Sequence, residues 1–183
     1  KILKNKNINE KTFNEFLPLI KDHPTILQIK KFENINNDSV IITEYMKNGS
    51  LSDLIDREYH SNCFSKLTDS VKYLIILGVE CAIDHLHLNH LYHGNLKTEK
   101  IFLDENYHAK LYFDNFPDQK DHEFLSDEEI ENIRSDDIFS FLLIFYEIMT
   151  GVKLEIDQNN KNVLPDLSLL KNEWQRSFIR KYW

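Results

Sequence analysis

The sequence predicts an α+β fold, with strands and one helix in the first third of the chain and mainly helices after it. Two observations favour this class. Apolar residues recur at helical spacing in two long segments, 69–89 and 135–150, whereas two shorter segments with strand-like patterns, 26–32 and 39–45, flank a polar loop. The 183 residues are 42% apolar and include 12 Phe and 8 Tyr, which is enough to form a substantial core.

The composition excludes several classes of protein. The net charge of −8 disfavours nucleic acids and anionic membranes as partners. No segment reaches the roughly 18 consecutive apolar residues of a membrane helix, so we expect no membrane insertion. The only cysteines, Cys63 and Cys81, offer no disulfide framework and fit a reducing cytoplasm, where we expect the protein to lie. Four histidines between residues 85 and 93 lack carboxylates or cysteines at ligand spacing, so no metal site is expected.

The elements of the first third follow from local patterns. Residues 10–21 predict a helix, because four apolar side chains recur at helical spacing, although Pro18 should weaken or bend it. Strands 26–32 and 39–45 come next. The sequence Asn-Gly-Ser that follows predicts a turn that caps a short helix beginning near Leu51.

The remaining elements are mainly helical. Asp69 is expected to cap a long helix that runs to about Asn89. Residues 101–103 and 109–112 predict two short strands around a tight turn.

The last long helix is expected to begin at Ser135 and to end at Gly151. The acidic run 127–131 before it has the pattern of a solvated helix start. Because residues 138–148 are apolar on nearly all sides, this helix is expected in the middle of the core.

Four segments resemble protein kinase domains, and they occur in the kinase order. Residues 23–27, His-Pro-Thr-Ile-Leu, are similar to the motif that leads into a kinase strand. Residues 40–51 resemble the strand, hinge and helix behind the adenine site, in their tyrosine-kinase-like form. Residues 92–101 resemble the catalytic loop written HRDLKPENI, and residues 137–151 the buried helix written DVYSFG…YE…TG. The resemblance predicts a protein-kinase-like fold.

The resemblance also implies a division into two parts. Residues 1–46 would form a partial small, β-rich N-lobe with the end of strand 3, helix C and strands 4 and 5. Residues 47–183 would form a mainly α-helical C-lobe that lacks its last helices, with Trp183 on the tryptophan of a late helix. Lys1 would fall on the lysine that grips the α/β-phosphates, so the glycine-rich loop would lie before it.

At the catalytic positions the resemblance implies degradation. Asn95 stands where kinases place the aspartate that accepts the substrate hydroxyl, and an uncharged amide cannot act as a base. Lys100 stands at a metal-binding asparagine, where its ammonium would repel Mg²⁺. The metal-binding aspartate of DFG falls on Phe113, so Asp114 could reach a metal only if the strand slipped by one residue. Lys97 keeps the kinase pattern.

Two further departures from the kinase pattern, at Asp114 and Gly94, lead to expectations about the activation segment. Asp114 would stand in the register of the DFG phenylalanine, inside an apolar column, where an unpartnered carboxylate is unfavourable. We therefore expect Asp114 to turn outward and the loop after it to be displaced. Gly94 replaces the arginine that binds activation-loop phosphate, so phosphorylation would have no partner there.

Further positions are assigned to a nucleotide site by the resemblance alone. They are Glu15, Thr43, Glu44, Met46, Asp53 and Phe102. Glu15 is the nearest candidate for the helical glutamate that pairs with the lysine, and Phe102 would lie under the adenine ring and narrow the slot. Two positions are expected to keep structural roles, His93 in the column that links the lobes and Asp137 as the cap of the catalytic loop.

These substitutions predict a pseudokinase that acts as a signalling scaffold or allosteric binding module, with other signalling proteins as partners. ATP binding should be weak at best, and Mg²⁺ is not expected. One alternative is a divergent active serine/threonine kinase of the tyrosine-kinase-like type that uses Asp114 and Lys97 in altered geometry. A second alternative is a non-functional remnant of a truncated kinase.

Overall fold

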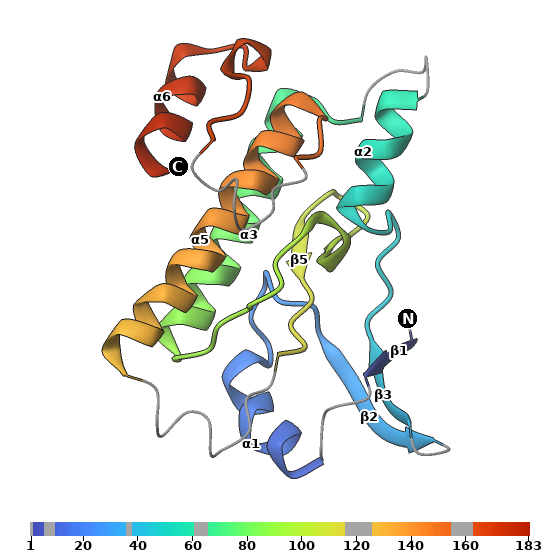
Figure 1. Ribbon diagram of the computed structural model, residues 1–183. Coiled ribbons are helices and arrows are strands. Elements are labelled where there is room, and N and C mark those ends of the chain that lie inside the picture. Colours follow the sequence, from blue (N-terminus) through green and yellow to red (C-terminus); the bar gives the residue numbers. More distant parts are fainter. Residues whose placement is uncertain (1, 6–9, 36–37, 61–65, 116–125, 155–162) are drawn as a thin grey trace.

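The computed structural model of the 183-residue chain describes residues 2–5, 10–35, 38–60, 66–115, 126–154 and 163–183. A three-stranded sheet and one helix lie at one end of the molecule, and long helices around a two-stranded sheet form the rest (Figure 1). This combination confirms the predicted α+β class.

The first sheet is antiparallel and consists of β1 (Ile2–Asn5), β2 (Ile29–Ile35) and β3 (Asp38–Thr43), with β3 in the centre. Helix α1 (Glu10–Ile20) accommodates Pro18 close to its C-terminal end. Its Phe13 stacks on Phe32 of β2, with the ring centroids 4.7 Å apart, and Ile41 of β3 is buried in the same cluster. Aromatic stacking therefore fixes α1 on the sheet.

Four further helices are α2 (Leu51–His60), α3 (Asp69–Leu88), α5 (Asp127–Thr150) and α6 (Glu173–Tyr182). A 3₁₀ turn, η2 (Leu167–Leu169), precedes α6. Helices α3 and α5 run side by side, and α6 packs near the C-terminal end of α5 (Figure 1). None of the helices in the described ranges has the length and apolar content that a membrane span requires.

The N-termini of α3 and α5 differ from the sequence prediction. Thr68, not Asp69, caps α3, and its hydroxyl accepts a hydrogen bond from the N–H of Val71 at 3.4 Å. Helix α5 begins at residue 127, eight residues before the predicted start at Ser135. Its cap is Ser126, which forms a capping box with Glu129, and the acidic first turn complements the helix dipole.

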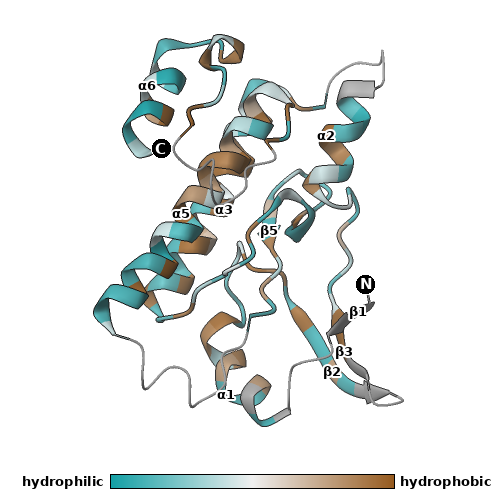
Figure 2. Ribbon diagram, in the orientation of Figure 1, coloured by the Kyte–Doolittle hydropathy of each residue, from teal (hydrophilic) through white to brown (hydrophobic). Residues whose placement is uncertain are grey.

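Helix α5 is buried over only part of its length. Its second half supplies Leu142, Ile144 and Phe145 to the core, whereas Ile138 in the first half is 45% exposed. Figure 2 shows the same change, from hydrophilic turns at the start of α5 to hydrophobic turns further along. The prediction that this helix lies in the middle of the core is therefore correct only for its second half.

The second sheet joins the two regions of the molecule. It pairs β4 (Ile101–Leu103) with β5 (Ala109–Leu111). The N–H of Leu111 donates to the carbonyl of Thr25 at 2.8 Å, and the N–H of Leu27 donates to the carbonyl of Leu111 at 2.9 Å. On its other side β5 rests on α3 where Gly78 permits close approach, since a Cβ at Gly78 would lie 3.2 Å from the Cβ of Ala109.

Candidate functional site

A loop that precedes β4 resembles a kinase catalytic loop, and we call residues 92–100 the catalytic-type loop. Asp137 of α5, only 1% exposed, holds its start. The Asp137 carboxylate accepts hydrogen bonds from the N–H groups of His93 and Gly94, both at 2.8 Å, and from Nε2 of His87 at 3.0 Å. Burial alone would raise the pKa of Asp137, but these hydrogen bonds hold the pKa below its ordinary value.

His93 connects this loop to the segment after β5. Its Nε2–H donates to the carbonyl of Tyr112 at 3.0 Å, and its Nδ1 accepts from the N–H of Asn95 at 3.3 Å. Burial lowers the pKa of His93, and the neutral ring fits both hydrogen bonds. The ring also meets Phe113 edge-on, with the centroids 6.2 Å apart.

Phe113 and Asp114 lie only partly as the sequence predicts. Phe113 is 1% exposed and fills the apolar position beside His93, while Asp114 forms an ion pair with Lys100 at the end of the catalytic-type loop. The ammonium of Lys100 also lies 5.2 Å from the ring centroid of Tyr112. Asp114 thus lies outside the apolar cluster that contains Phe113, as expected, but its carboxylate pairs with Lys100 and its side chain is only 22% exposed instead of turning fully to solvent.

Asn115 fastens the same segment to the catalytic-type loop. Its side-chain amide donates to the carbonyl of Tyr92 at 2.9 Å. Gly94 makes room for this amide: a Cβ at Gly94 would lie 3.1 Å from Nδ2 of Asn115, and the φ of Gly94 is +64°. The predicted displacement of the following loop concerns residues 116–125, which lie outside the described residues.

The end of the catalytic-type loop forms the 3₁₀ turn η1 (Thr98–Lys100) and is also anchored on α5. The hydroxyl of Thr98 donates to the carboxylate of Glu147, with its two oxygens 3.3 and 3.4 Å away. Burial raises the pKa of Glu147. Asn95 and Lys97 of the same loop are exposed.

The hinge positions are occupied by contacts within the chain. The hydroxyl of buried Thr43 donates to the carbonyl of Glu44 at 3.0 Å. The Glu44 carboxylate accepts from the N–H of Gln28 at 2.9 Å and from the ammonium of Lys110 at 2.8 Å. Glu44 is thus paired with β5 through Lys110, a role that its sequence position did not indicate.

Phe102 fills the place where an adenine floor is expected. It forms a buried cluster with Leu27, Met46 and Tyr112. Beside this cluster, a cavity of about 420 Å³ is lined by hinge residues together with Asp53. The Asp53 carboxylate accepts from the N–H of Ser50 at 3.2 Å and the N–H of Asp53 donates to the Ser50 hydroxyl at 3.1 Å, so the two residues form a capping box at the start of α2.

Two positions that the resemblance assigns to the nucleotide site, Lys1 and Glu15, are not found beside the hinge or the catalytic-type loop in the described structure. Lys1 lies outside the described residues. Glu15 is exposed on α1 and lies 3.9 Å from Lys11. Sequence reasoning did not assign roles to Tyr112 or Asn115; the visible signal was that Gly94 and Asn115 both depart from the kinase pattern.

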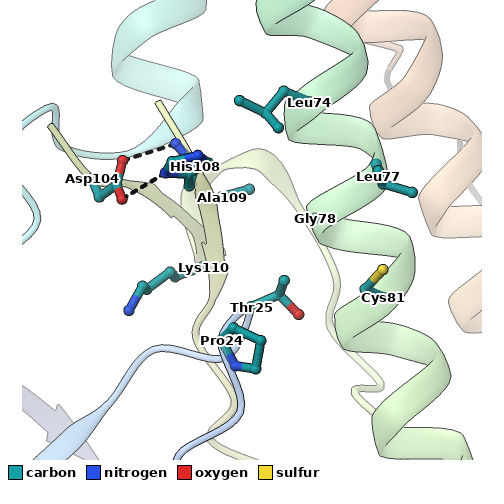
Figure 3. Close-up of a pocket in the computed structure, with 10 residues that line it drawn as sticks. All are labelled: Pro24, Thr25, Leu74, Leu77, Gly78, Cys81, Asp104, His108, Ala109 and Lys110. Carbon is teal, nitrogen blue, oxygen red and sulfur yellow. Dashed lines mark hydrogen bonds and ion pairs between the residues drawn. The ribbon is translucent and has the colours of Figure 1, made fainter. Parts of the chain in front are cut away.

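A second cavity, of about 400 Å³, lies between α3 and β5 (Figure 3). It is lined mainly by apolar groups such as Leu74 and Leu77. Two polar residues of its lining, Asp104 and His108, are hydrogen-bonded to each other, with Oδ2 of Asp104 and Nδ1 of His108 3.0 Å apart. Because polar groups do not converge on this cavity, the catalytic-type loop and hinge are the better candidate site.

Comparison with known proteins decides the family. A family model described as protein kinase domain matches residues 1–114. The chain belongs to the protein kinase superfamily. Protein LYK2 of Arabidopsis thaliana is 29% identical over 79% of this chain and 24% of its own length. The "Probable inactive L-type lectin-domain containing receptor kinase III.1" of the same plant is 30% identical over 81% of this chain and 25% of its own length.

A solved structure supports the same kinase fold. The crystal structure of Rad53 in complex with AMP-PNP aligns with a TM-score of 0.70 and 20% identity, over 99% of this chain and 51% of that one. The chain therefore spans about a quarter of the length of these curated relatives and about half of the solved kinase chain.

Membership of the kinase superfamily implies a divalent cation beside the catalytic loop, and the residues here do not fit one. Lys100 directs a positive charge at the Asp114 carboxylate. Mg²⁺ needs near-octahedral oxygen ligands, including one or two carboxylates, and an ammonium repels it.

Proposed function

We propose that this kinase-like domain is a pseudokinase, which does not transfer phosphate and serves as a scaffold or allosteric binding module for other signalling proteins in the cytoplasm. The observation that carries the proposal is the ion pair between Lys100 and Asp114. Lys100 stands where kinases place a metal ligand, and the ion pair engages the Asp114 carboxylate that contacts this position.

The catalytic base position supports the same conclusion. Phosphoryl transfer depends on placement and on cations that neutralise the transferring group, with a carboxylate that orients the substrate hydroxyl. Asn95 offers an exposed, uncharged amide in that place. Because groups of this kind act as a unit, losing the base and the metal ligands together leaves little residual catalysis.

The nucleotide position is unfavourable for tight binding. Phe102 is buried against Leu27, Met46 and Tyr112, so its ring narrows the space for an adenine beside the hinge. The carbonyl of Glu44 in the hinge already accepts the hydroxyl of Thr43. These contacts support ATP binding that is weak and does not depend on Mg²⁺.

A fixed shape supports the role of a binding module. Asp137 holds the start of the catalytic-type loop, and Asn115 ties the following segment to Tyr92. These contacts need neither a metal nor a phosphorylated loop. A surface built this way offers partners one preformed conformation, which lowers the entropic cost of binding.

A phosphotransfer assay tests the proposal. The purified chain is incubated with labelled ATP and Mg²⁺ or Mn²⁺, alongside Asp114→Ala and the double variant Asn95→Asp/Lys100→Asn. We expect the wild-type chain and Asp114→Ala to give the same background signal. Transfer that disappears in Asp114→Ala would contradict the proposal.

That contrary result would favour the alternative of a divergent active kinase that uses Asp114 and Lys97 in altered geometry. In that case Lys97, which is exposed in the same loop, is the next position to test. Cooperative unfolding of the purified chain would argue against a non-functional remnant.

A further inference from the structure

The chain contains two ion pairs that are alike in burial but differ in setting. Lys100 pairs with Asp114, with the two side chains 15% and 22% exposed, and Lys110 pairs with Glu44, with 18% and 23% exposed. Lys110 lies on β5 and joins the hinge to that strand. Lys100 lies at the end of the catalytic-type loop, in the position where a kinase places a metal ligand.

The surroundings of Lys100 are those of a bound cation. Its ammonium contacts the Asp114 carboxylate and lies over the ring of Tyr112, 5.2 Å from the centroid. Carboxylate oxygens and the face of an aromatic ring are both favourable neighbours for a positive charge. The backbone holds the partners together, because the N–H of Tyr112 donates to the carbonyl of Lys100 at 2.8 Å.

We propose that the ammonium of Lys100 is a tethered cation that takes the place of a divalent metal at Asp114. The inference rests on the proposed non-catalytic function, since a transferring kinase would need that carboxylate for a metal. A tethered cation is always present, carries one charge instead of two, and has no open coordination position for a ligand oxygen. The domain should therefore hold its shape without any divalent cation.

The proposal implies a latent metal site. An asparagine at position 100 would replace the ammonium with an amide oxygen, a ligand that Mg²⁺ and Mn²⁺ accept. The Asp114 carboxylate would then lose its ion pair with Lys100 and face a neutral oxygen donor instead. Lys100→Asn should thus convert a metal-independent domain into one whose stability responds to divalent cations.

Thermal unfolding of the full chain, in EDTA and in millimolar Mn²⁺, tests this implication. The wild type should unfold at the same temperature in both. Lys100→Asn should unfold roughly 2–4 °C lower in EDTA, the change expected for loss of about one half-buried pair. Mn²⁺ should restore part of that difference, because a ligand that binds only the folded state stabilises it. The double variant Lys100→Asn/Asp114→Asn should not respond to Mn²⁺.

Lys110→Asn is the matched control. It removes an ion pair of the same burial, and it should lower the unfolding temperature by a similar amount without any response to Mn²⁺. Direct binding of Mn²⁺ to Lys100→Gln, measured as loss of the free-ion electron paramagnetic resonance signal, provides a second measurement that does not depend on stability.

Two results would overturn the proposal. One is wild-type stabilisation by Mn²⁺ that disappears in Asp114→Asn, because Lys100 would then not exclude the metal. The other is absence of Mn²⁺ binding in both Lys100 variants, because the ammonium would then not occupy a cation site. Neither result depends on phosphate transfer, so failure here and failure of the proposed function are measured separately.

Discussion

Asp137 provides the sharpest test of how the catalytic-type loop is held. The change Asp137→Asn keeps the shape of the side chain but replaces one accepting oxygen with an NH₂ group. Three donors surround the carboxylate, namely the N–H groups of His93 and Gly94 and the Nε2 of His87. In any orientation of the amide, at least one donor must therefore face another donor.

The magnitude follows from those contacts. One buried N–H without an acceptor costs about 1–3 kcal/mol, and each remaining hydrogen bond loses about 1 kcal/mol when its acceptor is no longer charged. The free energy of unfolding should fall by about 3–5 kcal/mol, equivalent to roughly 10 °C in Tm for a chain of this size. Urea unfolding followed by circular dichroism measures this change.

The control is Asp136→Asn, an exposed neighbour on the same helix, which should change the stability by no more than about 0.5 kcal/mol. If Asp137→Asn were as stable as this control, the hydrogen bonds of Asp137 would not hold the start of the catalytic-type loop. The pH dependence gives a second check, because the pKa of Asp137 is lowered in the folded state. Its stabilisation is present above the pKa of the unfolded chain and is lost as the pH falls through the folded value, so the variant should lose less stability in acid.

Three further outcomes are expected. Phe102→Leu should cost about 1 kcal/mol of stability but open the adenine position, so ATP should bind more tightly by calorimetry; unchanged or weaker binding would contradict the packing argument. Because burial raises the pKa of Glu147, its stabilising contribution is present at low pH and is lost as the pH rises through the folded value. Glu147→Gln, which still accepts the hydroxyl of Thr98, should thus be as stable as the wild type at pH 7, or up to about 1 kcal/mol more stable, in urea unfolding. Gly78→Val should cost about 1–3 kcal/mol by overpacking against Ala109, and Ala109→Gly in the same chain should relieve part of that loss.

Elements with strong local patterns could be predicted from the sequence. The predicted ends of α3 lie within one residue of the observed ones, and β4 was predicted at its observed bounds, because periodicity and turn residues act over short distances. The start of α5 was misplaced at Ser135. The sequence contains the deciding signal, since Ser126 and Glu129 have the spacing of a capping box and the acidic run 127–131 has the pattern of a helix start.

The site was predictable in its residue types and not in its contacts. Asn95 and Lys100 follow from aligned positions, whereas counting along the chain assigned Asp114 to an apolar column. In the structure Phe113 takes the apolar place and Asp114 meets the ammonium of Lys100. Counting along the sequence gives a residue its aligned position. Which side chain enters the apolar cluster and which pairs with a charge depends on the free energy of each arrangement, which the count does not contain.

The contact between Gly94 and Asn115 also constrains how this domain could change in the future. A side chain at position 94 would have to adopt a φ of +64° and would meet the amide of Asn115 at 3.1 Å. A single substitution to arginine there would therefore strain the backbone and displace the amide of Asn115 by a few tenths of an ångström, which would weaken its bond to Tyr92. Under the proposed non-catalytic role, a phosphate-binding arginine at position 94 would therefore call for adjustment of both the backbone and Asn115, so the two positions are expected to change together.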